Sequence, residues 1–321
     1  MNNIFDSHAH YDSEAFDEDR DSLVASLPDK GICGVINCAS DIATSHTSLE
    51  LAQKYPFIYA ACGVHPHEAQ EAAGDWLDEL KLLCRNDKCV AIGEIGLDYH
   101  YDFSPREMQK EFFGRQLALA KELDLPVVVH DREAHEDTLE LLRRYAPKGV
   151  VHCFSGSVEM AKEVVKLGMY IGLGGAVTFK NARKPLEVAA YVPDDRLLIE
   201  TDSPYMTPVP FRGKRCDSSY IPYTAEVLAP AREEILQQIH ERLQPDHVSV
   251  EDGLALIAVV GQGMIYAKGT AARIFRVIAD ANINIRMIDQ GSSELNIIIA
   301  VKETDYELAI RSLYHAVERV L

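Results

Sequence analysis

The sequence IFDSHAH at residues 4–10 places two histidines two positions apart, directly after a short apolar run. If this run is a β-strand, the side chains of His8 and His10 point to the same side, because side chains alternate along a strand. Imidazole is the commonest metal-ligating side chain, so the pair predicts a cation site at the strand end. Two histidines at this spacing are more often ordinary polar residues, and the prediction therefore depends on what ends the later strands.

Short apolar runs recur along the chain with helical segments between them. The predicted strands are residues 4–8, 33–38, 58–64, 90–96, 126–130, 149–153, 169–173 and 197–201. The predicted helices are residues 21–27, 43–54, 76–84, 106–123, 136–145, 158–167 and 185–191. Strands that are apolar on both faces and alternate with helices indicate an α/β fold with a parallel sheet covered by helices. Eight such strands predict a closed (β/α)₈ TIM barrel. A doubly wound open sheet is the alternative, although no glycine-rich loop follows the first strand.

Polar side chains stand where these predicted strands end. They are His8 and His10, His65 and His67, Glu94 and Asp98, His130 to Arg132, His152, and Glu200 and Asp202. TIM-barrel enzymes keep their chemistry at the C-terminal ends of the strands. A core strand has no packing reason to finish in histidine or a carboxylate, and here this happens repeatedly. We interpret the recurrence as a metal site.

Two cations account for these donors. The six predicted ligands are His8, His10, Glu94, His130, His152 and Asp202. In this scheme His130 and His152 hold one cation, Glu94 gives one oxygen to each, and the other three residues hold the second. Nitrogen and oxygen ligands of this kind suit Zn²⁺ or Mn²⁺, and carboxylate with water admits Mg²⁺. Two ions about 3.5–4 Å apart make a shared hydroxide nucleophilic at neutral pH. Asp202 can accept the water's proton, so Asp202 and Glu94 are the predicted catalytic residues.

Together these motifs resemble the TatD family of metal-dependent deoxyribonucleases. The resemblance rests on DSHAH at 6–10, GVHPH at 63–67, GEIGLDY at 93–99, VHDR at 129–132, HCFSG at 152–156 and ETDSP at 200–204. It covers residues 3–228 and implies the (β/α)₈ barrel of the amidohydrolase superfamily. It also implies the same six ligands and the removal of nucleotides from DNA, often from a 3′ end. After residue 228 the family's usual closing helices do not follow, and residues 231–243 indicate one charged amphipathic helix.

Three further side chains are candidates for contact with a substrate phosphate. The resemblance implies this role for His65, which is otherwise a turn residue before a proline. Arg132 can steady a phosphate or form a salt bridge at a helix start. Arg212 opens an RGKR run that family members also carry, and this run grips phosphate or is a solvated surface cluster. Phe154 is a candidate for stacking on a base, and Asp98 either supports the shell behind Glu94 or caps a turn.

The last part of the chain has another character. Strands are predicted at 254–260, 283–290 and 294–301, and helices at 270–281 and 305–319. GQGM at 261–264, AARIF at 271–275 and NINI at 282–285 resemble the C-terminal ACT domain of aspartokinases, a small α+β (ferredoxin-like) domain. ACT domains pair side by side and bind amino acids at the interface. By analogy the 263–269 loop with Asn284, Ile285, Gln290 and Asn296 lines an effector site, and a purely dimerising module is the alternative.

We therefore expect three parts: a metal-dependent hydrolase barrel at 1–229, a linker helix at 230–246 and an ACT-like domain at 247–321. The first strand of the ACT-like part can gain an edge partner from residues 248–250.

Composition limits the partners. The formal net charge of −18 argues against a protein that wraps DNA, because such binding needs many cations. It does not exclude an enzyme that grips phosphates through divalent ions. Seven cysteines without a CxxC pair favour free thiols in a reducing cytoplasm. No apolar run is long enough to predict a membrane span.

The predicted function is a cytoplasmic metal-dependent hydrolase that cleaves DNA phosphodiester bonds, as an exonuclease, through a metal-bridged hydroxide. The ACT module would serve dimerisation, so that the protein is a homodimer, or regulation by an amino acid. One alternative is hydrolysis of a small amide, lactone or phosphoester on the same barrel. Many relatives with that chemistry bridge their metals with a carboxylated lysine, so Glu94 favours the nuclease. A catalytically silent amino-acid sensor is the other alternative, and the complete ligand set argues against it.

Overall fold

The computed structural model describes residues 2–72, 74–229, 254–260, 269–290 and 296–318. The chain folds into two compact units, Met1–Arg242 and Leu243–Leu321. The linker helix predicted at 230–246, the edge strand at 248–250 and most of the 263–269 loop lie outside the described residues. The three-part division with those junctions therefore stays a prediction.

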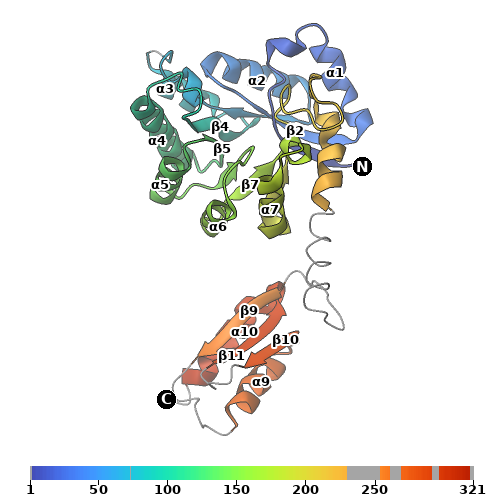
Figure 1. Ribbon diagram of the computed structural model, residues 1–321. Coiled ribbons are helices and arrows are strands. Elements are labelled where there is room, and N and C mark those ends of the chain that lie inside the picture. The colour runs from blue at the N-terminus through green and yellow to red at the C-terminus, as the bar shows by residue number, and fades with distance from the viewer. Residues whose placement is uncertain (1, 73, 230–253, 261–268, 291–295, 319–321) are drawn as a thin grey trace. The chain divides into compact units, whose positions relative to one another are not determined.

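Eight strands form the sheet of the first unit (Figure 1). They are β1 (Ile4–Ala9), β2 (Ile32–Cys38), β3 (Ile58–Cys62), β4 (Cys89–Asp98), β5 (Val127–Arg132), β6 (Gly149–Val151), β7 (Tyr170–Leu173) and β8 (Leu197–Ile199). Each pairs in parallel with the next strand along the chain, so the sheet order is the chain order. A parallel bridge between Ala9 and Ser203 joins the two edges. The predicted (β/α)₈ barrel is confirmed.

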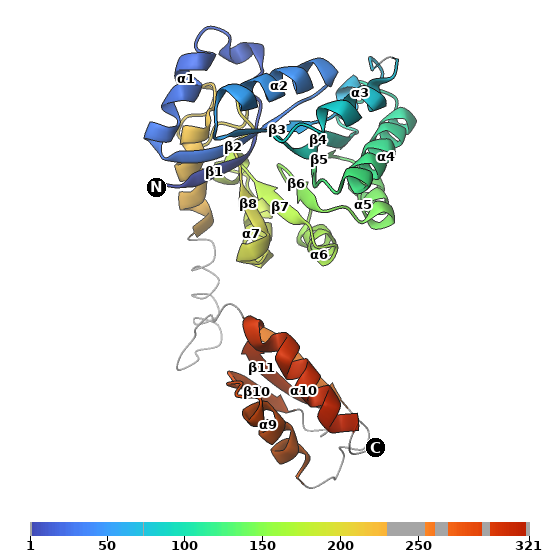
Figure 2. The same ribbon diagram turned by 180° about the vertical axis from the view of Figure 1, so that it is seen from behind.

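Helices connect the strands and lie around the outside of the sheet, as the two opposite views show (Figures 1 and 2). They are α1 (Arg20–Ser26), α2 (Ile42–Lys54), α3 (Trp76–Leu83), α4 (Arg106–Leu123), α5 (His135–Tyr145), α6 (Val158–Lys166) and α7 (Arg183–Tyr191). Side-chain caps fix where some of them begin, since Asp41 accepts a hydrogen bond from the Thr44 N–H and Ser157 accepts one from Met160. Asp41 lies in the connection between β2 and α2, and Ser157 lies in the connection between β6 and α6, so these two helix starts are set by local hydrogen bonds.

A further helical segment, residues 221–229, follows β8 although the sequence departs from the TatD pattern beyond it. Ile221 and Leu228 lie seven residues apart on one helix face, and both are buried in the barrel's apolar core. The helical cover of the barrel therefore extends beyond β8 before the described segment ends.

The close approach of β4 and β5 depends on Gly96. This residue has a φ of +145°, and a Cβ there would overlap the carbonyl oxygen of His130. Only glycine tolerates both conditions. The second glycine of the GEIGLDY motif therefore brings the strand that carries Glu94 against the strand that carries His130.

The described residues of the second unit form a three-stranded antiparallel sheet and two α-helices. The elements are β9 (Leu254–Val260), α9 (Thr270–Asp280), β10 (Met287–Gln290), β11 (Asn296–Lys302) and α10 (Tyr306–Glu318), and the strand order is β10-β11-β9. Ile278 of α9 and Leu313 of α10 share one buried apolar cluster with Ile299 of the central strand, so both helices cover the same face. The predicted α+β arrangement is confirmed for these residues.

All seven cysteines are free. Among the described residues, no helix combines the length and the apolar character that crossing a membrane requires.

Candidate metal centre

The polar side chains predicted from the strand ends gather at the C-terminal end of the barrel. Those that meet there are His8, His10, Glu94, His130, His152 and Asp202. Backbone pairing explains how the two ends of the barrel sequence come together. The Asp202 N–H donates to the His8 carbonyl (2.9 Å), and the His10 N–H donates to the Ser203 carbonyl (2.7 Å). The last strand thus delivers its carboxylate beside the first strand's histidines.

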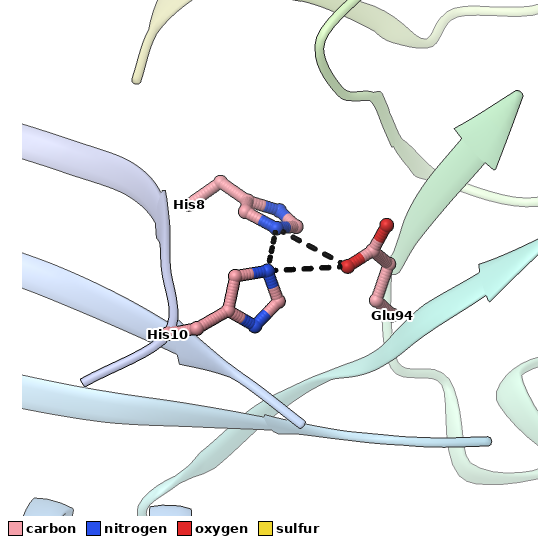
Figure 3. Close-up of side chains that lie close together, drawn as sticks. All are labelled: His8, His10 and Glu94. Carbon is pink, nitrogen blue, oxygen red and sulfur yellow. Dashed lines mark hydrogen bonds and ion pairs between the residues drawn. The ribbon is translucent and has the colours of Figure 1, made fainter. Parts of the chain in front are cut away.

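The first histidine cluster consists of His8, His10, Asp202 and one oxygen of Glu94. The two Nε2 atoms lie 3.0 Å apart. Glu94 Oε2 is 3.3 Å from the first and 3.4 Å from the second. Asp202 Oδ1 lies 3.7 Å and 3.5 Å from the same two nitrogens. Figure 3 shows that only one carboxylate oxygen of Glu94 reaches this pair, while the other points away.

The second histidine cluster forms around that other oxygen. Glu94 Oε1 lies 2.8 Å from His130 Nδ1 and 2.8 Å from His152 Nε2. It also lies 3.4 Å from Nε2 of His65, for which the family resemblance implies contact with a phosphate. Glu94 therefore presents one oxygen to each of two groups of imidazoles.

Donor spacing in the first histidine cluster fits a divalent cation. Zinc–nitrogen bonds of about 2.0–2.1 Å in a tetrahedron put neighbouring donor atoms about 3.4 Å apart. The separations in the first histidine cluster run from 3.0 to 3.7 Å. All donors are nitrogen or carboxylate oxygen, which suits zinc and manganese.

Ionisation of the clusters shows what a cation would replace. Burial raises the pKa of Glu94, but the imidazoles of His152, His65 and His8 outweigh burial and hold it well below its usual value. Burial lowers the pKa of His10, yet hydrogen bonds to Asp202 and Glu94 raise it well above the ordinary value. These shifts favour a charged Glu94 beside a protonated His10, and a bound cation would replace that proton.

Asp98 holds the second histidine cluster from behind. Its Oδ2 accepts hydrogen bonds from His130 Nε2 (3.0 Å) and from His67 Nε2 (2.9 Å). Its Oδ1 accepts from the backbone N–H groups of His100 (3.0 Å) and Tyr101 (2.9 Å). Both roles considered for Asp98 are therefore realised, because one oxygen orients a predicted ligand and the other caps a turn.

Glu200 lies behind the two clusters. Its Oε1 accepts a hydrogen bond from the Cys153 N–H. The same oxygen lies 3.5 Å from His152 Nδ1, but these two atoms form no hydrogen bond. Three buried atoms lack a hydrogen-bond partner within the described residues: Glu200 Oε2, His152 Nδ1 and His8 Nδ1. The rings of His8 and His152 stack 3.8 Å apart. If His152 carries its proton on Nδ1, its Nε2 is free for a cation and its N–H is directed toward this carboxylate.

The predicted phosphate contacts have different surroundings. His65 is buried, and burial lowers its pKa to about 4, so the ring is neutral. Its Nδ1 accepts from the His67 N–H, which leaves the proton on Nε2. Arg132 is the last residue of β5 and is exposed. Its guanidinium lies 4.7 Å from the Tyr101 ring centroid. Arg212 lies 3.6 Å from the Phe179 ring centroid.

Sequence reasoning missed the contribution of Asp6. Asp6 is fully buried and accepts hydrogen bonds from Thr201 (2.6 Å) and Ser218 (2.7 Å), so it ties β1 to the segment after β8. The signal was its place beside the two histidines in DSHAH. Phe154 was assigned a stacking role that the structure excludes, because this ring is 3% exposed and packs in the barrel core.

A parallel (β/α)₈ barrel with histidines and carboxylates converging at its C-terminal end defines a metal-dependent hydrolase. The model of the TatD related DNase family matches residues 5–245, and the chain belongs to this family. An ACT domain model matches residues 257–317, so the second unit is an ACT domain.

Similar proteins agree with this assignment. The uncharacterized metal-dependent hydrolase YabD of Bacillus subtilis is 44% identical over 74% of this chain and 94% of its own length. The 3′-5′ ssDNA/RNA exonuclease TatD of Pectobacterium parmentieri is 36% identical over 72% of this chain and 92% of its own length. The crystal structure of the TatD homologue YJJV of Escherichia coli K12 superposes with a TM-score of 0.67 at 32% identity, covering 74% of this chain and 96% of YJJV.

The predicted effector residues lie at opposite ends of the strand pair β10–β11, because Met287 pairs with Ala300 and Gln290 with Ile297. Asn284 and Ile285 precede β10, Gln290 ends it, and Asn296 begins β11. Gln290 pairs with Ile297, the residue after Asn296, so these two positions are close in the backbone. Ile285 packs against the apolar core of the unit, and Asn284 is exposed.

Proposed function

We propose that the protein is an exonuclease that hydrolyses the phosphodiester bonds of DNA from a 3′ end with the help of divalent metal ions. The observation that carries the proposal is the position of Glu94, whose two oxygens face two separate groups of imidazoles. The name of the Pectobacterium parmentieri relative, a 3′-5′ ssDNA/RNA exonuclease, supports the polarity. The seven free cysteines support a reducing compartment, the cytoplasm.

Two ions such as Zn²⁺, Mn²⁺ or Mg²⁺ would be held by the six predicted ligands. They are His8, His10, Glu94, His130, His152 and Asp202. When bound, such ions activate water and stabilise negative charge on phosphoryl oxygens.

The chain's own residues position the reaction. Asp202 Oδ1 is in the first histidine cluster and accepts the proton of the attacking water. His65 carries its proton on Nε2 and donates it in a hydrogen bond to a non-bridging phosphate oxygen. Arg132, exposed at the end of β5, and Arg212, in the segment after β8, contact phosphates of the strand.

The test is incubation of 5′-labelled single-stranded DNA with the protein and Mg²⁺, Mn²⁺ or Zn²⁺. A ladder of strands shortened one nucleotide at a time from the 3′ end is expected. The same preparation is offered small amides, lactones and phosphotriesters. Turnover of one of these, with no shortening of DNA under any ion, would contradict the nuclease.

For the ACT domain we propose binding of an amino acid at the end of the sheet formed by Gln290 and Asn296. Isothermal calorimetry with lysine and threonine tests this proposal, and measurement of the oligomeric state by light scattering accompanies it. Heat that disappears in a Gln290→Ala variant supports an effector site at this end, and heat that disappears only in an Asn284→Ala variant places the site at the opposite end of β10. A dimer that binds neither amino acid leaves dimerisation as the role of the unit.

A further inference from the structure

Two exposed aromatic rings lie beside the metal centre. Phe103 and Tyr101, in the loop between β4 and α4, are 63% and 48% exposed. Their ring centroids lie 5.2 Å apart, and their planes are inclined by 17°, so the rings stack. Large apolar side chains are normally buried, and two that stack with each other in water form a surface on which a third flat ring can be placed.

We call Phe103 and Tyr101 the aromatic platform. Two histidine rings, His67 and His65, connect this platform to the second histidine cluster. The ring of His67 contacts Phe103 edge-on at 4.8 Å and Tyr101 at 5.5 Å. The ring of His65, which faces Glu94, lies 4.3 Å from His67. One imidazole thus separates the platform from residues that contact the bridging carboxylate.

Asp98 fixes this arrangement through its two oxygens. One caps the turn that carries Tyr101 by accepting its N–H (2.9 Å), and the other accepts from both His67 and His130. The platform and a predicted metal ligand are therefore attached to the same buried carboxylate. An aromatic pair that only covered a loop would need no such connection.

The chemistry around the platform suits a nucleobase. Arg132 contributes a guanidinium 4.7 Å from the Tyr101 centroid, and a cation beside stacked rings favours nucleic acid. A chain with a net charge of −18 gains little non-specific affinity from a phosphate backbone, so base stacking can add affinity for a strand beyond the local phosphate contacts. Two rings are too small an area for a stable protein interface, which buries about 800 Å² on each partner.

We propose that Phe103 and Tyr101 form a stacking subsite for a base of the strand whose phosphate lies at the metal centre. The inference rests on the proposed nuclease function and specifies its substrate as nucleic acid with at least one unpaired base near the scissile bond. Stacking tolerates all four bases, so the subsite confers a requirement for a base without a sequence preference.

The experiment compares two single-stranded oligonucleotides, one with all its bases and one whose two 3′-terminal nucleotides are abasic. The Phe103→Leu variant keeps an apolar side chain and removes the ring. Its kcat/KM on the complete strand is expected to fall between about fivefold and a hundredfold. On the abasic strand the variant and the parent protein are expected to be equal, and Phe103→Trp is expected to keep the preference for the complete strand.

A binding measurement that does not need turnover accompanies the kinetics. A strand with 2-aminopurine near its 3′ end is expected to lose fluorescence when the parent protein stacks on it, and to keep it with Phe103→Leu. The matched control is Tyr191→Leu, at the end of α7, another exposed ring. This control is expected to behave like the parent protein in both assays.

Two results would contradict the stacking subsite, and they have different consequences for the nuclease proposal. If Phe103→Leu lowers the rate on complete and abasic strands by the same factor, the ring has a structural role and the nuclease stands. If the parent protein shortens neither strand, the nuclease proposal is lost together with the platform.

Discussion

The two histidine clusters share Glu94 but are supported in different ways. In the first, His10 donates from Nδ1 to the backbone carbonyl of Cys38 (2.7 Å), a partner that no side-chain substitution removes. In the second, His130 donates to the carboxylate of Asp98 (3.0 Å), which a single substitution can change. A backbone carbonyl therefore orients a histidine of the first cluster, whereas a buried side chain orients a histidine of the second.

The largest effect is expected where the two clusters meet. Glu94→Gln keeps the side-chain volume and removes the charge that faces both groups of imidazoles. We expect loss of about 4 kcal/mol of transition-state stabilisation, on the order of a thousandfold in kcat/KM. Activity on labelled DNA and bound metal measured by mass spectrometry check it, with circular dichroism as the control for folding. Retained turnover would show that Glu94 is not required at the metal centre.

A smaller, structural effect is expected from Gly96→Ala, which acts on the second histidine cluster through the backbone. The added Cβ would overlap the carbonyl of His130 at a φ of +145°. We expect a loss of about 3 kcal/mol in the free energy of unfolding, measured by denaturant titration. Gly74→Ala is the matched control, because Gly74 also has a positive φ but nothing within 4 Å of its Cβ. Equal losses in the two variants would show that crowding between β4 and β5 is irrelevant.

Asp98→Asn tests the support of the second histidine cluster alone. The amide is a weaker acceptor for His130 Nε2, so we expect metal affinity at one of two sites to fall between about tenfold and a hundredfold. Metal titration should show one site weakened and the other unchanged. Asp124→Asn, an exposed carboxylate paired with Lys148, is the control. Equal weakening of both sites would mean that the two halves are not supported independently.

The smallest effect concerns His135, which begins α5 and pairs with Asp131, the residue after His130 in β5. Its hydrogen bond to Asp131 raises its pKa, so the folded state favours the protonated ring. The stabilisation is complete below the unfolded pKa of about 6.5 and is lost as the pH rises through the higher folded value. Since the ring is 42% exposed, His135→Asn should cost at most about 0.5 kcal/mol at pH 5.5 and nothing at pH 9. Urea midpoints without added metal check this, and an equal cost at both pH values would contradict it.

Much of the fold was predictable because its signal is local. Strand runs such as residues 33–38 and 197–201 alternate with amphipathic segments, and barrel topology then follows from the right-handed connection of parallel strands. The convergence of His8 with Asp202 was predictable for the same reason, since C-terminal strand ends of a barrel share one face.

Other features depend on side-chain directions that spacing does not fix. Nothing in the sequence distinguished Phe154, which packs inward, from Phe103, which is exposed, because both follow a strand within a polar loop. The distance of His65 from Glu94 and that of Asp98 from His130 depend equally on the backbone geometry at the ends of β3 and β4.

The central claim, that Glu94 bridges two cations, is tested most directly by anomalous diffraction from crystals grown with zinc. We predict two anomalous peaks, one against His8 Nε2 and one against His130 Nδ1, each about 2.0–2.2 Å from a different oxygen of Glu94. A single peak, or two peaks that Glu94 does not touch, would contradict the account.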